Sequence, residues 1–441
     1  MLGQLRTGRY FFLLTLIIMS IGPSGVLKAG TFVKAIVSNP KEGGAMLDTI
    51  SLPDYPPQGY YRVKMIRSQI CNADRRALGG TKKNELRTQK IVLGHEGLGV
   101  IVESSIKTST RYNIGDLVVL CPHLLSPDDQ MHTYNLPNLS PHMKHMGIHT
   151  DGVFADVLDY PEYNVYKIPK AQDIIQRVGK EAYYNQMVLV EPLACVQRGI
   201  KLVVQRELIR DQDEFKILIL GGGPMGILHA MHLQNTFPHT DVSLYDPDPL
   251  RQDLATHIPG LHTNILSYLE PSLGLYDLVI VATSNFRANV QDCFQMCKHD
   301  GTVLLFSGID LLATQHYPVI NGIDIEVLHR YEGFAQILDR RNESHIVRIN
   351  IVGTSGYVKE DFATAIEELH TDLMRNPQPL FKGVATAYVN HLDGKILRDL
   401  SGRAKDAIFL TPALLPMLAL YNERMEDQFN VRRYLKIYVK H

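Results

Sequence analysis

Cysteine is scarce in this chain of 441 residues, which has five, an odd number at wide spacing. Small secreted domains held by disulfides carry a dense and even set, so the sequence argues against a disulfide framework and for a reducing compartment. An excess of one charge is also lacking, because 45 basic and 46 acidic residues leave a net charge of −1. Proteins that bind nucleic acid or anionic membranes usually carry a basic excess. We therefore expect no nucleic-acid partner, and small, roughly neutral ligands instead.

Internal repeats, low-complexity tracts and apolar runs long enough to span a membrane are absent as well. An apolar run at residues 11–19 follows Arg6 and Arg9 but is too short to cross a bilayer comfortably. It resembles a secretory signal without a clean cleavage site; an anchor, or a start assigned too early with Met19 as the first residue, are the alternatives. We treat residues 1–30 as a leader of unknown role and do not expect it to bind a membrane.

Two domains are expected, because a chain of this length exceeds one ordinary hydrophobic core. The first part, residues 31–196, consists of short alternating or apolar runs between turns, which predict β-strands. Strands are predicted at 32–37, 97–102 and 116–120. The stretch 122–151 is rich in Pro, Asn, Ser and His and is predicted to be a long loop or lobe.

Alternating strands and helices begin near residue 215. Strands are predicted at 216–220, 241–245, 276–282 and 301–307, with helices at 225–233 and in a run that continues through Cys297. Cys293 and Cys297 would share one face of that last helix, and we expect them to be a buried apolar pair. The alternation predicts an α/β fold with a parallel, doubly wound sheet. Beyond it, an amphipathic helix with acidic residues near its start is predicted at 359–369.

A glycine-rich turn joins the strand 216–220 to its helix, which is the context that a dinucleotide-binding turn requires. Gly221 allows the tight turn, Gly223 lets the backbone approach a pyrophosphate, and Gly226 lets helix and strand pack closely. Asp246 ends the next strand, where a carboxylate binds both ribose hydroxyls and repels a 2′-phosphate, so NAD is favoured over NADP. Arg251 follows one helical turn later and is expected to face solvent. The predicted cofactor-binding residues are Gly221, Gly223, Pro224, Met225, Gly226 and Asp246.

Four residues are candidate metal ligands: Cys71, His95, Glu96 and Glu191. His95 and Glu96 lie in a predicted turn, where adjacent side chains can reach one ion. Thiolate, imidazole and carboxylate together suit a tetrahedral zinc with one open position. The alternative is a buried cysteine, a core histidine and a surface glutamate. Glu191 interrupts an apolar stretch, where a carboxylate is costly unless it binds a metal or forms a salt bridge to an arginine.

These motifs resemble the zinc-dependent medium-chain alcohol and polyol dehydrogenases, the family that includes sorbitol and threonine dehydrogenases. The matching segments are 70–74, 92–97, 115–118, 152–156, 190–194, the glycine turn and 352–356. The resemblance implies a mostly β, GroES-like catalytic domain in two parts, 31–196 and 341–441, with an NAD-binding Rossmann domain inserted at 197–340. It also implies that Cys71, His95 and either Glu191 or Glu96 hold one catalytic zinc.

Two departures from the family pattern affect the expected chemistry. Family members usually carry a hydroxyl residue, which passes on the substrate proton, where this chain has Ala73. The proton then needs another route, through Glu96 and a water or through Asp74, and these two are the predicted catalytic residues. The family also often places four cysteines in the lobe, of which only Cys121 is present here. Five histidines occupy the region instead, and we expect polar surface residues in a lobe that has lost its metal: His123, His132, His142, His145 and His149.

The resemblance implies an NAD-dependent zinc enzyme that transfers a hydride between NAD and a secondary alcohol or ketone, with a polyol, sugar or cyclitol as substrate. The alternatives are a zinc-free quinone or enoyl reductase of the same superfamily, and a dinucleotide-binding protein without turnover. A homodimer or homotetramer is expected by analogy with the family. Because an enzyme that needs a nicotinamide cofactor has little use for export, we expect a cytoplasmic protein.

Overall fold

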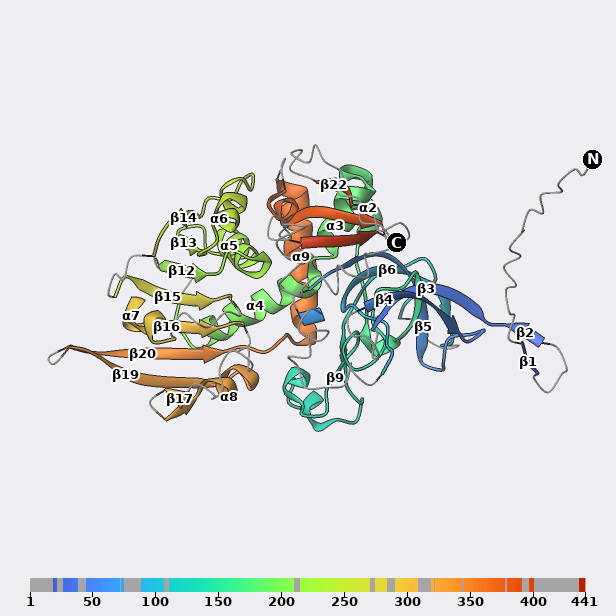
Figure 1. Ribbon diagram of the computed structural model, residues 1–441, viewed down its shortest axis with the longest axis horizontal. Helices are drawn as coiled ribbons and strands as arrows, with labels where there is room; N and C mark the ends of the chain where they lie inside the picture. Colours follow the sequence, from blue (N-terminus) through green and yellow to red (C-terminus); the bar gives the residue numbers. More distant parts are fainter. Residues whose placement is uncertain are drawn as a thin grey trace, which may run out of the picture.

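Two large β-sheets lie side by side, with helices between them (Figure 1). The computed structural model describes residues 19–21, 27–38, 45–71, 73–74, 89–106, 111–209, 215–269, 274–283, 290–307, 319–320, 322–342, 345–376, 379–390, 396–399 and 436–440. Residues 1–18 and 22–26 of the expected leader are outside this described part. Within the leader, β1 (Met19–Ile21) and β2 (Leu27–Ala29) pair antiparallel.

The first sheet has eight strands in the order β11-β7-β6-β5-β23-β21-β22, with β10 also paired to β5. Its strands are β5 (Tyr60–Gln69), β6 (Glu96–Ser104), β7 (Leu117–Leu120), β10 (Val157–Pro161), β11 (Val165–Lys167), β21 (Ala385–Asn390), β22 (Ile396–Asp399) and β23 (Lys436–Lys440). β23 pairs antiparallel with β5, so segments far apart in the chain complete one sheet. The described residues also form four two-stranded pairs: β1 with β2, β3 (Thr31–Ser38) with β4 (Ala45–Leu52), β8 (His123–Leu124) with β9 (Lys144–His145), and β17 (Val319–Ile320) with β18 (Ile323–Asp324).

The second sheet has seven strands in the order β14-β13-β12-β15-β16-β20-β19, and only β19 runs antiparallel to its neighbour. Its strands are β12 (Lys216–Leu220), β13 (Asp241–Tyr245), β14 (Asn264–Leu266), β15 (Tyr276–Val281), β16 (Cys297–Leu305), β19 (Phe334–Asn342) and β20 (His345–Gly353). The apolar run of β12 is buried on both faces, as a central parallel strand requires. The predicted doubly wound sheet is confirmed.

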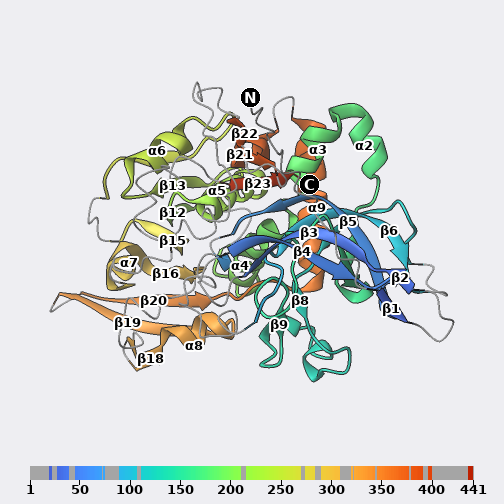
Figure 2. The same ribbon diagram turned by 45° about the vertical axis from the view of Figure 1, so that its right-hand side comes forward.

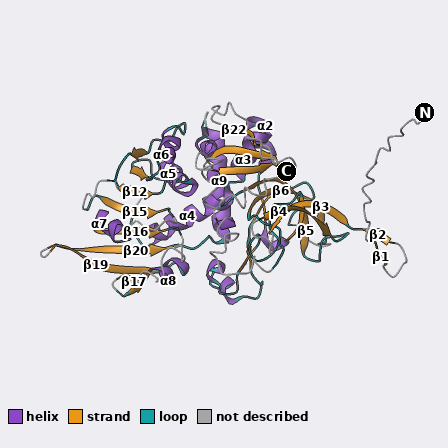
Figure 3. Cartoon of the chain, viewed as in Figure 1, coloured by secondary structure: helices purple, strands orange, loops and turns teal. Residues whose placement is uncertain are grey.

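Helices cover the second sheet and fill the space between the two sheets (Figures 2 and 3). They are α2 (Ala171–Val178), α3 (Lys180–Met187), α4 (Val190–Gln205), α5 (Pro224–Thr236), α6 (Pro249–Thr256), α7 (Val290–Met296), α8 (Ile325–Arg330) and α9 (Lys359–Arg375), with 3₁₀ turns η1 (Gln130–His132), η2 (Pro137–Leu139), η3 (Glu162–Asn164) and η4 (Leu380–Val384). α4 and α9 contribute to one shared apolar core. In the described part of the chain, every helix is too short or too polar to cross a membrane.

One helix boundary differs from the expected one. The helix predicted to run through Cys297 ends at Met296, because Cys297 already pairs with Tyr276 in the parallel sheet. Cys293 and Cys297 are both buried, but they do not share a helix face. The expected domain limit at residues 196/197 falls inside α4, and the one at residue 340 falls inside the β19–β20 hairpin of the second sheet.

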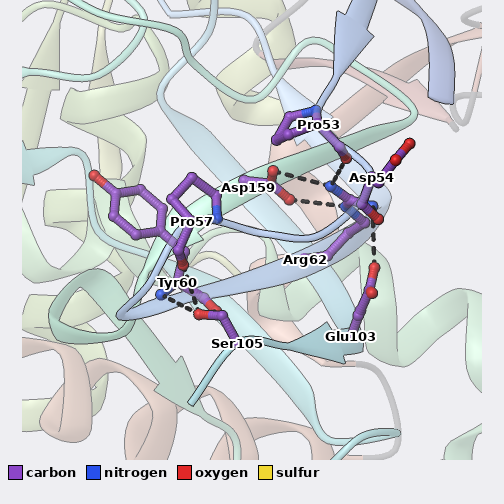
Figure 4. Close-up of polar contacts among 8 residues, drawn as sticks. All are labelled: Pro53, Asp54, Pro57, Tyr60, Arg62, Glu103, Ser105 and Asp159. Atoms are coloured by element: carbon purple, nitrogen blue, oxygen red, sulfur yellow. Dashed lines mark hydrogen bonds and ion pairs between the residues drawn. The ribbon is translucent and has the colours of Figure 1, made fainter. Parts of the chain in front are cut away.

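An ion cluster around Arg62 fastens the β4–β5 connection to the first sheet (Figure 4). The guanidinium is 6% exposed and donates to both carboxylate oxygens of Asp159, at 2.8 and 3.1 Å, and to Glu103 at 3.0 Å. It also donates to the backbone carbonyls of Pro53 and Asp54, at 2.6 and 3.3 Å. The hydrogen bond to Asp159 raises the pKa of Arg62, although burial opposes it.

Candidate metal and cofactor site

Cys71, His95 and Glu96 meet where β5 ends and β6 begins. Their ligand atoms all lie within 4.8 Å of one another, and this is the one such group of three or more His, Cys, Asp or Glu residues in the described part. The register explains the meeting, because Gln69 of β5 pairs with Glu96 of β6 and Cys71 follows two residues after Gln69. His95 and Glu96 are buried and Cys71 is half-buried. The set offers one thiolate, one imidazole and one carboxylate, which suits zinc.

Asp74 holds two of these three residues. Its wholly buried carboxylate lies 2.8 Å from His95 Nδ1 through one oxygen, and accepts the Cys71 backbone N–H at 2.9 Å through the other. With Nδ1 engaged, Nε2 is the His95 nitrogen left for a metal, an arrangement common around metal-binding histidines. Burial opposes protonation of His95, but the charges of Asp74 and Cys71 raise its pKa well above the ordinary value. This geometry favours a positioning role for Asp74 over the proton route considered from sequence.

Three glycines set the turn that carries His95. Gly94 has φ +87°, and the ring of Phe154 occupies the space where a side chain at Gly94 would lie. A Cβ atom at Gly147 or Gly152 would overlap the carbonyl oxygen of Gly94. That oxygen also accepts the backbone N–H of Val153 at 3.0 Å. The end of the lobe is thus packed directly on the backbone of the ligand turn.

Glu191 lies beside this group but is not part of it. It is 9% exposed in the first turn of α4, and Cys195 Sγ, one turn further on, is 4.0 Å from its Oε1. Burial, followed by the charges of Glu191, Cys71 and Glu96, raises the pKa of Cys195 well above its usual range. The sequence left Glu96 and Glu191 as alternatives for one ligand position. In the structure, Glu96 lies within ligand distance of Cys71 and His95.

Of the five lobe histidines, His142 is exposed as expected, His132, His145 and His149 are half-buried, and His123 is buried. His123 is 7% exposed, and its ring stacks on Tyr357 with a centroid distance of 4.3 Å and an interplanar angle of 7°. The ring of His145 lies edge-on to the ring of His123, with a centroid distance of 4.7 Å. Burial and the charge of His95 lower the pKa of His123 to about 3. Ala73 is half-buried and packs against an apolar core, without a hydroxyl to offer.

The glycine turn lies where β12 meets α5. Gly221 has φ +114°, and a Cβ at Gly226 would overlap the Gly221 carbonyl oxygen, so strand and helix are in direct backbone contact. A Cβ at Gly223 would meet no atom within 4 Å, so the space over this residue is open. Pro224 and Met225 begin α5, whose first turn presents backbone N–H groups without partners in the helix. An anion fits at such a helix N-terminus.

Asp246 and Arg251 border this turn. One Asp246 oxygen accepts the Gly222 N–H at 2.7 Å and the other accepts the Asp248 N–H at 2.9 Å, which fixes the carboxylate beside the turn. Arg251, expected to face solvent, is half-buried in α6, and a Cβ at Gly222 would lie 3.4 Å from its Cβ. Its position one helical turn after Asp246 was the feature of the sequence that could have placed Arg251 beside the glycine turn.

Several known proteins are similar to this chain. The family described as alcohol dehydrogenase GroES-like domain matches residues 57–170. The chain is 29% identical to glucose 1-dehydrogenase 1 of Caldivirga maquilingensis over 255 residues, which cover 57% of this chain and 68% of that protein. It is 26% identical to D-altritol 5-dehydrogenase of Agrobacterium fabrum over 271 residues, which cover 61% of this chain and 74% of that protein.

Among solved structures, the acetophenone reductase of Geotrichum candidum in complex with NAD has the same fold. Its TM-score is 0.63 at 17% sequence identity, and the match covers 94% of this chain and 98% of that one. The expected combination of a GroES-like unit and a Rossmann unit is confirmed.

Proposed function

We propose, since this chain belongs to the zinc-type medium-chain alcohol and polyol dehydrogenases, that it transfers a hydride between NAD and a secondary alcohol or ketone. The observation that carries the proposal is the Cys71, His95 and Glu96 group, built in the same molecule as the open glycine turn. Neither feature alone defines an alcohol–carbonyl oxidoreductase.

The residues present fit both cofactors. Cys71, His95 and Glu96 would hold the zinc, with Glu191 beside them, and Asp74 would keep His95 in the required tautomer. The open space over Gly223 would admit a pyrophosphate at the start of α5. When bound, zinc supplies a Lewis acid that stabilises an alkoxide, and the nicotinamide supplies a hydride acceptor or donor.

Proton transfer depends on the remaining side chains. Ala73 has no hydroxyl, and both oxygens of Asp74 already accept hydrogen bonds. We therefore assign the substrate proton to the route through Glu96 and a water, and Glu191 is the second carboxylate beside the ligand group.

A polyhydroxylated substrate, such as a sugar or sugar alcohol, is favoured by the ligand set and by the relatives. A carboxylate in place of a second cysteine resembles the polyol branch of the family, and the relatives reported above are named for glucose and altritol. Asp246 beside the glycine turn favours NAD over NADP, because its charge would repel a 2′-phosphate. We infer this substrate class by analogy with the sites of related enzymes.

We further infer a homodimer or homotetramer in the cytoplasm, following the habit of the family and the need for NAD. For the domain division, we place the end of the cofactor unit after Gly353 and not at residue 340. Both strands of the β19–β20 hairpin then stay in the sheet to which they are bonded.

Metal analysis combined with NAD reduction on a panel of polyols, sugars and cyclitols tests the proposal. We expect about one zinc per chain and turnover with at least one compound, and Cys71→Ser should remove zinc and turnover together. Cys293→Ser, which changes a buried cysteine in the core of the cofactor unit, is the matched control and should keep both. Purified protein without zinc would refute the mechanism, and zinc without turnover would point to a binding protein.

A further inference from the structure

A buried carboxylate joins three parts of the molecule that are far apart in the sequence. Glu332 lies between α8 and β19, is 6% exposed, and has the unusual φ of +50° for a residue other than glycine. The carbonyl oxygen of the next residue, Gly333, accepts a hydrogen bond from the N–H of Gly353 in β20, at 2.9 Å. Glu332 is therefore attached to the cofactor sheet.

The Glu332 carboxylate accepts hydrogen bonds from two other units. Arg198 of α4 donates from Nε at 2.8 Å to one oxygen and from Nη2 to the other. Asn138 of the lobe donates from Nδ2 at 2.8 Å, and the same nitrogen reaches the carbonyl oxygen of Ser355 at 2.7 Å. Arg198 and Asn138 are 6% and 4% exposed. We call these three side chains, with the Ser355 carbonyl, the junction.

Both hydrogen-bond partners of Glu332 belong to elements that pack beside the metal ligands. Arg198 lies about two helical turns beyond Glu191 on α4, so it fixes the helix that carries Glu191 and Cys195. The Cys195 thiol of this helix is within reach of the charges of Cys71 and Glu96. Asn138 fixes the lobe, whose far end packs Gly147 against the carbonyl of Gly94, next to His95. The lobe and α4, which flank the ligand group, are therefore both hydrogen-bonded to the Glu332 side chain of the cofactor unit.

We propose that Glu332 is a positioning residue for hydride transfer, which sets where the metal ligands lie relative to the cofactor turn. The inference rests on the proposed function for the reaction itself. A buried ion pair is a poor source of stability, because desolvation of both charges opposes their attraction. What it provides is one defined geometry, since Arg198 binds both oxygens and leaves the carboxylate a single orientation. Reaction rates depend steeply on such geometry, and a misplacement of about 1 Å costs on the order of 100-fold.

Two variants test the proposal. Glu332→Gln keeps the shape and removes the charge, and the double variant Arg198→Met with Glu332→Leu replaces the pair by apolar side chains, which keeps the protein folded if the single variant is unstable. We expect both to bind zinc and NADH as the wild type does, while kcat on the best compound of the polyol panel falls by about 10- to 100-fold.

Asp159→Asn is the matched control. It removes the carboxylate of another buried arginine pair, with Arg62, in the cluster of Figure 4 that fastens the β4–β5 connection. We expect its kcat to stay within about twofold of the wild type, since the described hydrogen bonds of Arg62 reach Pro53, Asp54, Glu103 and Asp159 and no residue of the junction. A kcat loss in the control equal to that of the Glu332 variants would overturn the positioning role.

A second measurement separates this inference from the proposed function. With cobalt(II) in place of zinc, NADH binding should change the visible absorption of the metal in wild type and control, and change it less in both Glu332 variants at equal NADH affinity. A wild type without turnover on the panel would refute the proposed function and leave this spectral comparison to decide the role of Glu332. Identical spectral changes in wild type and both variants would overturn the inference, as would unchanged kcat in both.

Discussion

Replacing Asp74 with asparagine tests how the metal ligands are held. The carboxylate is wholly buried and serves His95 through one oxygen and the Cys71 backbone N–H through the other. Asparagine has nearly the same shape but only one acceptor oxygen. Whichever way the amide turns, one ligand residue loses its partner and faces an NH₂ group, and the negative charge that favours the Nδ1–H tautomer of His95 is gone.

The magnitude follows from the number of contacts. Loss of an outer partner of a metal ligand lowers metal affinity by about 10- to 100-fold, or roughly 1.4 to 2.8 kcal/mol. Because Asp74 supports two ligand residues, we expect the upper half of that range, about 30- to 100-fold. Substrate chemistry is not needed to see the effect.

Competition with a chelator of known zinc affinity, at neutral pH, measures the change directly. Asp372→Asn is the control, because Asp372 of α9 is 2% exposed and accepts hydrogen bonds from Gln186 of α3 and from the Leu380 N–H of η4. We expect the control to bind zinc as tightly as the wild type. An Asp74→Asn protein with zinc affinity within about twofold of the wild type would refute the positioning argument.

Three further predictions concern the cofactor, the proton and the stability. Asp246→Ser should raise the KM for NAD about tenfold and allow reduction of NADP, because the repelling charge is lost; steady-state kinetics with both cofactors decide, and unchanged selectivity would contradict the ribose role. Ala73→Ser should raise kcat and lessen its solvent isotope effect if a missing hydroxyl limits proton transfer, and an unchanged isotope effect would place the proton elsewhere. His229 is wholly buried, and burial lowers its pKa to about 3, so the unfolded chain binds the extra proton between about pH 6.5 and 3 and stability falls as pH falls through that window. His229→Leu should make this loss smaller in urea unfolding followed from pH 7 to 4, and an equal pH slope would contradict it.

Short-range signals made most of the cofactor unit predictable. The strands Lys216–Leu220 and Asp241–Tyr245 have the predicted limits, because apolar runs between a glycine turn and a proline leave little freedom. The helix end before Cys297 was missed, since pairing with β15 decides it and helical periodicity does not. The sheet likewise continues past residue 340 through a hairpin that the local pattern does not distinguish.

The ligand residues could be named from sequence, but their arrangement could not. Whether Glu96 or Glu191 joins Cys71 and His95 depends on the register of β5 on β6 and on the packing of α4, which are contacts between distant segments. The link between Asn138 and Glu332, 194 positions apart, has no local signal at all.

The pairing of β23 with β5 has a consequence for biosynthesis. A ribosome releases β5, with Cys71 just beyond it, long before residues 436–440, and all strands of the cofactor sheet emerge in the interval. Domains generally fold as units while the chain is still being made. The cofactor unit can therefore fold during translation, while the strand that leads to the metal ligand waits for its last neighbour. The sheet edge that leads to Cys71 is therefore complete only after residues 436–440 have emerged.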